Sequence, residues 1–319
     1  MNYCTMNNAE IIKYGIPLII KDIFKVKSEE EHLECRKFLK ALCDKEYGIF
    51  TYVLSCLSKL KDQEMTDELK IECAILNSFI CKMLSLYELA TNDRFVELIG
   101  ETKKRIDSVS GQNIIARALY ELLLLHHQLL VRPKDENERE LLVDLWRLSS
   151  INNYLEEPLF GSNIIQNRQD AEETQKELIA KIKASPCYTE RNRRLIDDRI
   201  KDKNVKYLVF ESNGVLKPIS ITKMWDVLYD DGIFKNKDSA MLYNRLSTEH
   251  HSTCLGLIFE EQLVNEERDL RLLPFYLGCS LLALIVDNVL RKHQIIANLL
   301  YSRYNLEDIE CHNVFCDQL

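Results

Sequence analysis

The sequence contains very little glycine and proline, with 9 and 6 residues respectively among 319. Together they make up about 5% of the chain, against an average usage of about 12%. Glycine and proline punctuate turns, so their scarcity predicts few, long structural elements. Long elements in a globular chain are helices, and we therefore predict an all-α, multi-helix bundle.

The chain also lacks the paired cysteine motifs of a structural zinc site. None of its eleven cysteines forms a Cys-x-x-Cys pair, and its only Cys/His cluster is Cys311, His312 and Cys316. Because no second cluster lies at zinc-finger spacing, we expect a frayed C-terminal tail there, with no metal and no cofactor. Residues 1 to 10 lack the apolar core of a signal peptide, which predicts reduced thiols and a cytoplasmic location.

No apolar run is long enough to be expected to span a membrane. The longest covers residues 272 to 286 and is interrupted by Pro274 and Gly278. A spanning helix needs about 20 apolar residues. We therefore expect a buried core helix at this position, and no membrane partner.

The formal net charge of −8 is spread along the sequence without a long block of one sign. Such a chain is poorly suited to holding duplex nucleic acid by bulk electrostatics, although a local basic pocket for a single strand or a nucleotide stays open. The most basic stretch runs from Arg191 to Lys206. We expect it to be a solvated face, the alternative being an RNA or phosphate contact.

Helix signals recur along most of the chain. Ser28 and Thr66 are expected to cap helices, because acidic residues and then apolar residues at helical spacing follow each of them. A hairpin is predicted near residues 207–216, where Asn213-Gly214 is a turn signal. We expect an N-terminal helical subdomain over 1–105 and a helical bundle over 106–319. The helices are expected near residues 28–42, 47–60, 66–83, 92–108, 114–131, 135–147, 172–182, 219–229, 254–268 and 274–299.

One segment, residues 243 to 251, combines side chains that suggest chemistry. Arg245 precedes His250 by five residues and His251 by six. A histidine can move a proton near neutral pH, and an arginine can stabilise the charge that develops on phosphate. Such groups could cleave RNA without a metal, the histidine activating the 2′-hydroxyl. On one helix, however, the two spacings place Arg and His about 140° and about 120° apart, so the site would need a partner chain or a helix break.

This spacing resembles the Arg-x4–6-His motif of HEPN domains, helical bundles that often act as dimeric RNases in defence and toxin systems. The resemblance implies an RNA or nucleotide substrate and a homodimer or protein partner. HEPN motifs usually carry a polar residue directly after the arginine, whereas this sequence has Leu246 there.

A second set of residues resembles a bacterial family, domain of unknown function 5677, over roughly residues 100 to 300. The resemblance implies a helical fold and, through some members, a link to phage defence, but no established activity. It centres on Tyr, Ser and His and favours His251 over His250. The residues that carry it are Lys217-Pro218-Ile219-Ser220, Tyr243, Leu246-Ser247 and His251-Ser252, with Arg117 and Glu121 upstream.

Tyr243, Ser247 and His251 would lie on successive turns of one helix. Ser247 could act as a nucleophile if His251 reaches it, a contact that the four-residue spacing permits. Tyr243 is either core packing or a hydroxyl that contacts a ligand. Arg117 and Glu121, one turn apart, form either a structural ion pair or part of a polar binding pocket.

The remaining histidines are given structural roles. We expect His126 and His127 to be a satisfied core or edge pair, and His32 and His293 to lie at the surface. Two functions follow from the sequence. The first is a metal-independent RNase or nucleotide-processing protein of a bacterial defence or toxin system, with His251 or His250 as general acid/base and Arg245 or Arg117 stabilising phosphate charge. The alternative is a non-enzymatic helical interaction or sensor module.

Overall fold

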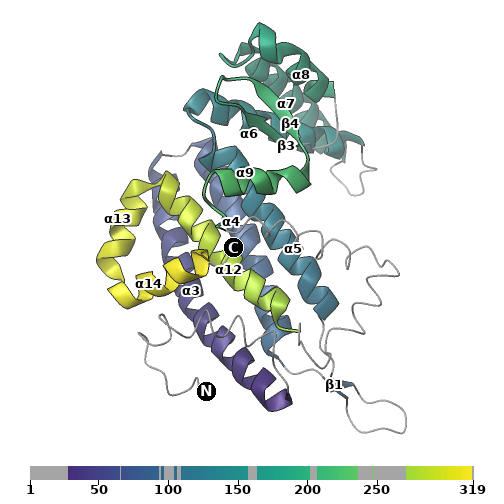
Figure 1. Cartoon of the computed structure of the whole chain (residues 1–319). Coiled ribbons are helices and arrows are strands. Elements are labelled where there is room, and N and C mark those ends of the chain that lie inside the picture. The colour runs from purple at the N-terminus through teal and green to yellow at the C-terminus, as the bar shows by residue number, and fades with distance from the viewer. Residues whose placement is uncertain are drawn as a thin grey trace. The chain divides into compact units, whose positions relative to one another are not determined.

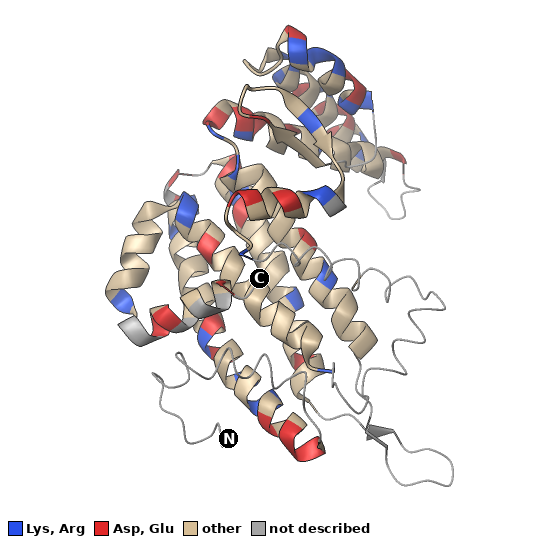
Figure 2. Ribbon diagram, viewed as in Figure 1, with Lys and Arg blue, Asp and Glu red and all other residues tan. Residues whose placement is uncertain are grey.

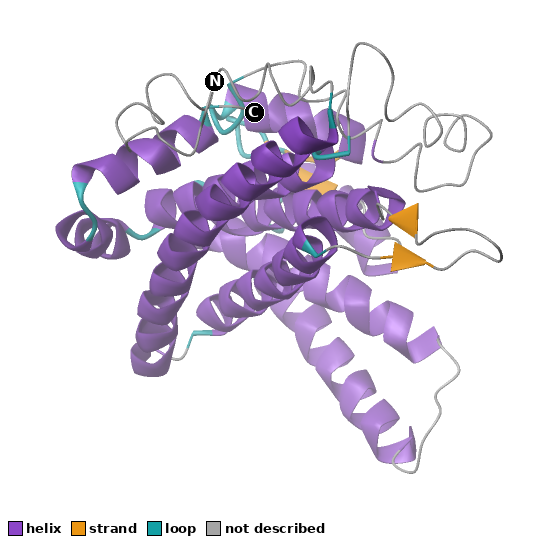
Figure 3. Cartoon of the chain, turned by 90° about the horizontal axis from the view of Figure 1, so that it is seen from below, coloured by secondary structure: helices purple, strands orange, loops and turns teal. Residues whose placement is uncertain are grey.

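The computed structural model describes residues 28–64, 66–92, 95–96, 104–105, 109–156, 164–201, 207–235, 246 and 271–317. It is mostly helical (83%) and confirms the all-α prediction (Figures 1 and 3). The helices of this part are α3 (Glu29–Glu64), α4 (Asp67–Thr91), α5 (Val109–His126), the π-helical turn η3 (His127–Val131), α6 (Glu136–Glu156), α7 (Ile164–Ala184), α8 (Glu190–Lys201), the 3-10 turn η4 (Ile221–Lys223), α9 (Met224–Asp230), α12 (Leu273–Lys292), α13 (Gln294–Arg303) and α14 (Leu306–Cys316).

The chain divides into two compact units. Unit 1 comprises residues 1–126 and 225–319, and unit 2 comprises residues 127–224. The sequence suggested a single boundary at residue 105, whereas in this grouping unit 1 combines segments from both ends of the sequence. It brings α12, from late in the sequence, together with α3 and α4 from its beginning.

Unit 1 is built on four long helices. Helix α3 packs on α4, α4 on α5, α5 on α12 and α12 back on α3, which makes a four-helix bundle (Figure 1). Helix α13 lies against α3, and α14 lies against α12. The two central aromatic side chains, Phe50 and Phe79, are buried and stack with their ring centroids 6.1 Å apart. Burying such side chains is the main source of stability for a bundle of this kind.

The helix starts follow the capping signals. The Ser28 hydroxyl accepts a hydrogen bond from the Glu31 amide at 3.2 Å, and the Thr66 hydroxyl accepts one from the Leu69 amide at 3.3 Å. Both caps satisfy an amide that the first helical turn leaves without an intrahelical acceptor. The two apolar segments expected at 28–42 and 47–60 are joined in one continuous helix, α3, because the helical spacing carries on through Gly48.

Gly278 lets α12 approach α4 closely. A Cβ atom there would overlap the side chain of Leu86 and lie 3.3 Å from the sulfur of Met83, and both of these residues are buried. The absence of a side chain at this position therefore fixes how near the two helices come.

The apolar segment at 272–286 forms the buried core helix that was expected, α12. It does not continue to residue 299 as one helix, because the backbone leaves the helical region at His293 and α13 then begins. Among the described residues, two helical segments, Val109–Val131 and Leu273–Lys292, are long and apolar enough to cross a membrane. The second of them is almost entirely buried by other parts of the protein, as in the core of a globular domain.

Unit 2 is organised around α6. Helices α7 and α8 and the turn η3 all pack on α6, and the hairpin of β3 (Tyr207–Phe210) and β4 (Leu216–Ile219) lies against η3 and α8. The strands pair antiparallel with Phe210 opposite Leu216. Gly214 has a φ of +76°, which a tight hairpin turn requires and glycine adopts readily. The hairpin predicted near residues 207–216 is confirmed.

Two local expectations were wrong. Residues 92–108 were expected to be helical, but Phe95–Val96 (β1) pairs antiparallel with Lys104–Arg105 (β2). The C-terminal tail was expected to fray, but it forms α14, and His312 on this helix is buried.

Candidate functional site

Most of the segment that the sequence singled out lies outside the described residues. This holds for Tyr243, Arg245, Ser247, His250 and His251, and also for the helix expected over 254–268. Within the segment only Leu246 is described, and it is helical and buried. The acid/base, nucleophilic and binding roles given to those five residues therefore stay predictions.

Arg117 and Glu121 are described, and they contact each other along α5. The Arg117 Nε atom lies 2.9 Å from the Glu121 Oε1 atom, with the two side chains 20% and 36% exposed. This is the geometry of an intrahelical ion pair one turn apart. Their role as ligand-binding residues stays a prediction.

We expect Arg117→Ala to lower the free energy of unfolding by less than about 1 kcal/mol, because partly exposed ion pairs contribute little. Urea denaturation followed by circular dichroism measures it. Arg168→Ala is the matched control, since Arg168 pairs with Glu172 at the same spacing on α7 and is more exposed. A loss above about 2 kcal/mol for Arg117→Ala alone would show instead that Arg117 anchors the bundle.

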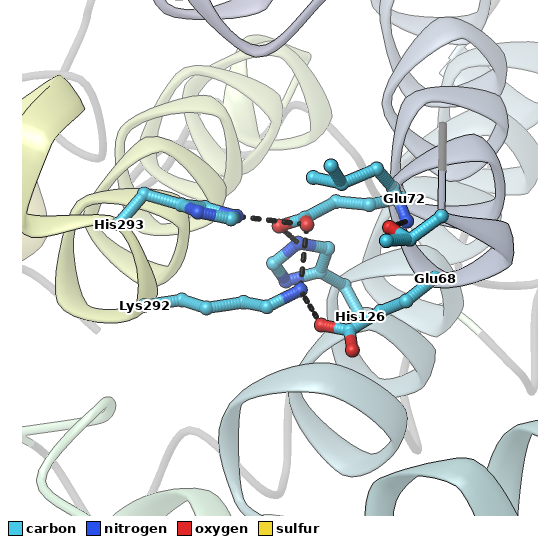
Figure 4. Close-up of polar contacts among 7 residues, drawn as sticks. Glu68, Glu72, His126, Lys292 and His293 are labelled. Carbon is cyan, nitrogen blue, oxygen red and sulfur yellow. Dashed lines mark hydrogen bonds and ion pairs between the residues drawn. The ribbon is translucent and has the colours of Figure 1, made fainter. Parts of the chain in front are cut away.

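A buried polar cluster does occur in unit 1, and it is centred on Glu72. The Glu72 cluster consists of Glu68, Glu72, His126, Lys292 and His293 (Figure 4). The His126 Nε2 atom lies 3.1 Å from one carboxylate oxygen of Glu72, and the His293 Nε2 atom lies 2.9 Å from the other. The Lys292 ammonium lies 2.6 Å from Glu72 and 2.5 Å from Glu68, and so bridges the two carboxylates.

The cluster forms where the start of one helix, which carries acidic residues, meets the ends of two others, which carry basic residues. Glu68 and Glu72 lie in the first two turns of α4, His126 ends α5, and Lys292 and His293 lie at the end of α12. A helix start favours negative side chains and a helix end favours positive ones. The antiparallel arrangement of α4 against α5 and α12 therefore brings opposite charges to the same end of the bundle.

Glu72 keeps its charge despite complete burial. Its side chain and that of His126 have no exposed surface, while Lys292, His293 and Glu68 are 8%, 16% and 26% exposed. Burial by itself would raise the pKa of Glu72. Hydrogen bonds from His126 and His293 and the charge of Lys292 outweigh burial, and hold the pKa of the carboxyl well below its usual range.

Each histidine can satisfy Glu72 without carrying a charge. A neutral imidazole with its proton on Nε2 donates one hydrogen bond, which is the contact that both His126 and His293 make. With both rings neutral, the two carboxylates and one ammonium leave the cluster with a charge of −1.

A second buried pair holds the C-terminal helix. The His312 Nδ1 atom lies 2.9 Å from Glu46 Oε2, and its Nε2 atom lies 3.7 Å from the Cys316 sulfur. Burial would lower the pKa of His312, but the charge of Glu46 raises it well above its usual value. Within the described residues, no group of three His, Cys, Asp or Glu is arranged to hold a metal ion.

Sequence interpretation assigned His126 correctly but missed the cluster around it. His126 lies in the core, as expected, and contacts Glu72, whereas His293 is mostly buried against Glu72 and His32 is buried, so both surface assignments were wrong. Glu72 itself was not singled out. The signal was present, because Glu72 falls on the buried face of α4 beside Leu69, Cys73 and Leu76, where a lone carboxylate needs partners.

Comparisons with known proteins do not assign the chain to a family. No family model matches the chain, and neither a curated protein nor a solved structure is detectably similar to it. The resemblances to HEPN domains and to domain of unknown function 5677 therefore stay predictions.

Proposed function

We propose that this chain acts as a non-enzymatic helical module, a sensor or binding partner, as far as its described residues are concerned. The observation that carries the proposal is the Glu72 cluster. Its central carboxylate is fully enclosed, and each of its charged side chains contacts an opposite charge or a hydrogen-bonding partner.

A catalytic group must contact the reacting atoms of a substrate, and a substrate cannot reach the centre of the Glu72 cluster. His126 and Glu72 have no exposed surface, so neither can contact a substrate in this conformation. A general acid or base must come within hydrogen-bond distance of the proton that it moves. The cluster instead links α4, α5 and α12, which supports a role in organising the bundle.

A metal-independent RNase or nucleotide-processing protein of a bacterial defence or toxin system is the second candidate. It is supported by the sequence of residues 243–251, which holds Arg245, His250 and His251 within seven positions. In this proposal His251 or His250 is the general acid/base and Arg245 stabilises the phosphate charge. RNA or a nucleotide is then the substrate, and a homodimer could complete the site.

One experiment separates the two proposals. Purified full-length protein, His250→Ala/His251→Ala and His293→Gln are each incubated with total RNA in the presence of EDTA, and the RNA is examined on a denaturing gel. The module proposal predicts intact RNA in every case. Cleavage by the wild type that is lost only in the His250→Ala/His251→Ala variant would overturn it and establish the RNase.

If cleavage were lost only in His293→Gln, the Glu72 cluster would contain the chemistry, which would also overturn the module proposal. Circular dichroism of each variant checks that the helical content is unchanged.

A further inference from the structure

Unit 2 carries a concentration of positive charge that neither proposed function uses. Residues 181 to 201 contain seven Lys or Arg and three Asp or Glu, a formal charge of +4 in a chain whose total is −8. Two of the lysines, Lys181 and Lys183, lie in the last turn of α7, and the other five cations lie on α8. Figure 2 shows blue segments recurring along α8.

The cations of α8 lie mainly on its solvent side. Only Asn192 and Ile196 of this helix are buried. Arg191, Arg194 and Lys201 are exposed, and at 100° per residue they fall within about 80° of one another. We call these three residues the α8 basic face. Two acidic residues are exposed on or beside the same face, Asp198 between the cations and Glu190 next to Lys201 and Arg194, so the cations exceed the acids there by one.

Asn192 fixes this face in place. Its side-chain amide donates to the carbonyl oxygens of Cys187, at 3.2 Å, and Gly214, at 3.1 Å, while its oxygen accepts from the Leu216 amide at 2.9 Å. The start of α8 is therefore tied both to the turn that precedes it and to the β3–β4 hairpin. Side chains presented by a fixed helix lose less entropy on binding than those of a mobile loop.

We propose that the α8 basic face binds single-stranded nucleic acid through its phosphate backbone. Two of its three cations are arginines, whose planar guanidinium groups match phosphate oxygens in a bidentate manner. A helix of 12 residues is about 18 Å long and so spans several phosphates of an extended strand.

The composition of this region favours a polyanion over a membrane or a protein surface. The exposed large hydrophobic side chains of the described residues include none between residues 181 and 201. Membrane insertion and protein interface cores both depend on such side chains. Non-specific contact with a phosphate backbone depends mainly on positive charge.

This inference rests on the module proposal, because it names single-stranded nucleic acid as the partner that the module binds. It is tested by fluorescence anisotropy with labelled 20-nucleotide oligo-U and oligo-dT, the full-length protein and EDTA. The test variant is Arg191→Glu/Arg194→Glu/Lys201→Glu. The matched control is Lys37→Glu/Lys59→Glu/Lys70→Glu, which changes the net charge equally at exposed positions of α3 and α4.

Three phosphate contacts predict that wild-type affinity falls about 20-fold between 50 and 200 mM salt. We expect the α8 variant to bind at least about 10-fold more weakly at 50 mM salt and to lose most of this salt dependence. The control should change affinity by less than about 3-fold. Comparing oligo-U with oligo-dT shows whether RNA or DNA is the preferred source of the backbone.

Absence of wild-type binding, or equal weakening by the control variant, would overturn the inference and leave the module proposal standing. Equal competition by poly-glutamate would also overturn it, since the face would then bind any acidic polymer. Cleavage of the oligo-U during the assay would overturn the module proposal. Binding would then be measured with oligo-dT, which lacks the 2′-hydroxyl that the proposed cleavage requires.

Discussion

Replacing Glu72 with alanine is expected to lower the free energy of unfolding by about 3 to 5 kcal/mol, as when one member of a buried ion pair is removed. The change leaves the buried His126 ring without its acceptor at 3.1 Å, and it leaves Lys292, only 8% exposed, with Glu68 as its remaining acidic partner in the cluster. Urea denaturation followed by circular dichroism at pH 7 measures the loss.

Two further variants are compared with Glu72→Ala, one that separates the charge of Glu72 from its volume and one that serves as a control. Glu72→Gln keeps the size of the side chain and removes the charge, so it should lose a large part of the same stability. Glu121→Ala, on the partly exposed face of α5, should lose less than about 1 kcal/mol. Equal, small losses for Glu72→Ala and Glu121→Ala would contradict a structural role for the cluster.

The difference between wild type and Glu72→Gln should also depend on pH. The folded protein holds the pKa of Glu72 well below its usual value, so the carboxylate stabilises the fold at pH values above that usual value. This contribution is lost as the pH falls from about 4.5 through the folded-state pKa. The two proteins should therefore converge in stability in acid.

Asn192→Ala is expected to cost about 3 kcal/mol, the second largest effect. The substitution removes three hydrogen bonds and leaves the Leu216 amide and the carbonyls of Cys187 and Gly214 without this partner. Each such bond contributes about 1 kcal/mol, and leaving a buried group unpaired costs more. The unfolding midpoint of unit 2 in urea, followed by hydrogen exchange of the hairpin amides, reports the loss.

Asn153→Ala is the matched control, because Asn153 is exposed on α6 of the same unit. It should leave the midpoint and the hairpin exchange rates unchanged. If Asn192→Ala also left them unchanged, α8 would not depend on Asn192 for its position. The claim that Asn192 holds the α8 basic face in place would then be wrong.

The local parts of the fold were predictable because their causes are local. Ser28 and Thr66 cap helices through hydrogen bonds that span three residues, and Gly214 supplies the positive φ of its turn. The helical spacing of apolar residues likewise placed the starts of α4 and α6 one residue from those observed, although both helices continue beyond their predicted ends. Such features need no knowledge of which helix packs on which.

The Glu72 cluster was not predictable in the same way. Its members come from positions 54 and more than 200 residues apart, and they meet only because α4 runs antiparallel to α5 and α12. The helix end at His293 was missed because no proline or glycine marks it. The contact that Lys292 and His293 make with Glu72 at this point is a tertiary one.

A double-mutant cycle between Glu72 and His293 tests the central claim most directly, namely that Glu72 holds separate helices together through its histidine and lysine partners. Glu72→Gln, His293→Ala and the double variant are compared with the wild type in urea denaturation at pH 7. Residues in contact show coupling energies of about 0.5 to 3 kcal/mol, whereas distant residues add to within a few tenths. We predict a coupling above about 1 kcal/mol. Additive losses from the two substitutions would contradict the account.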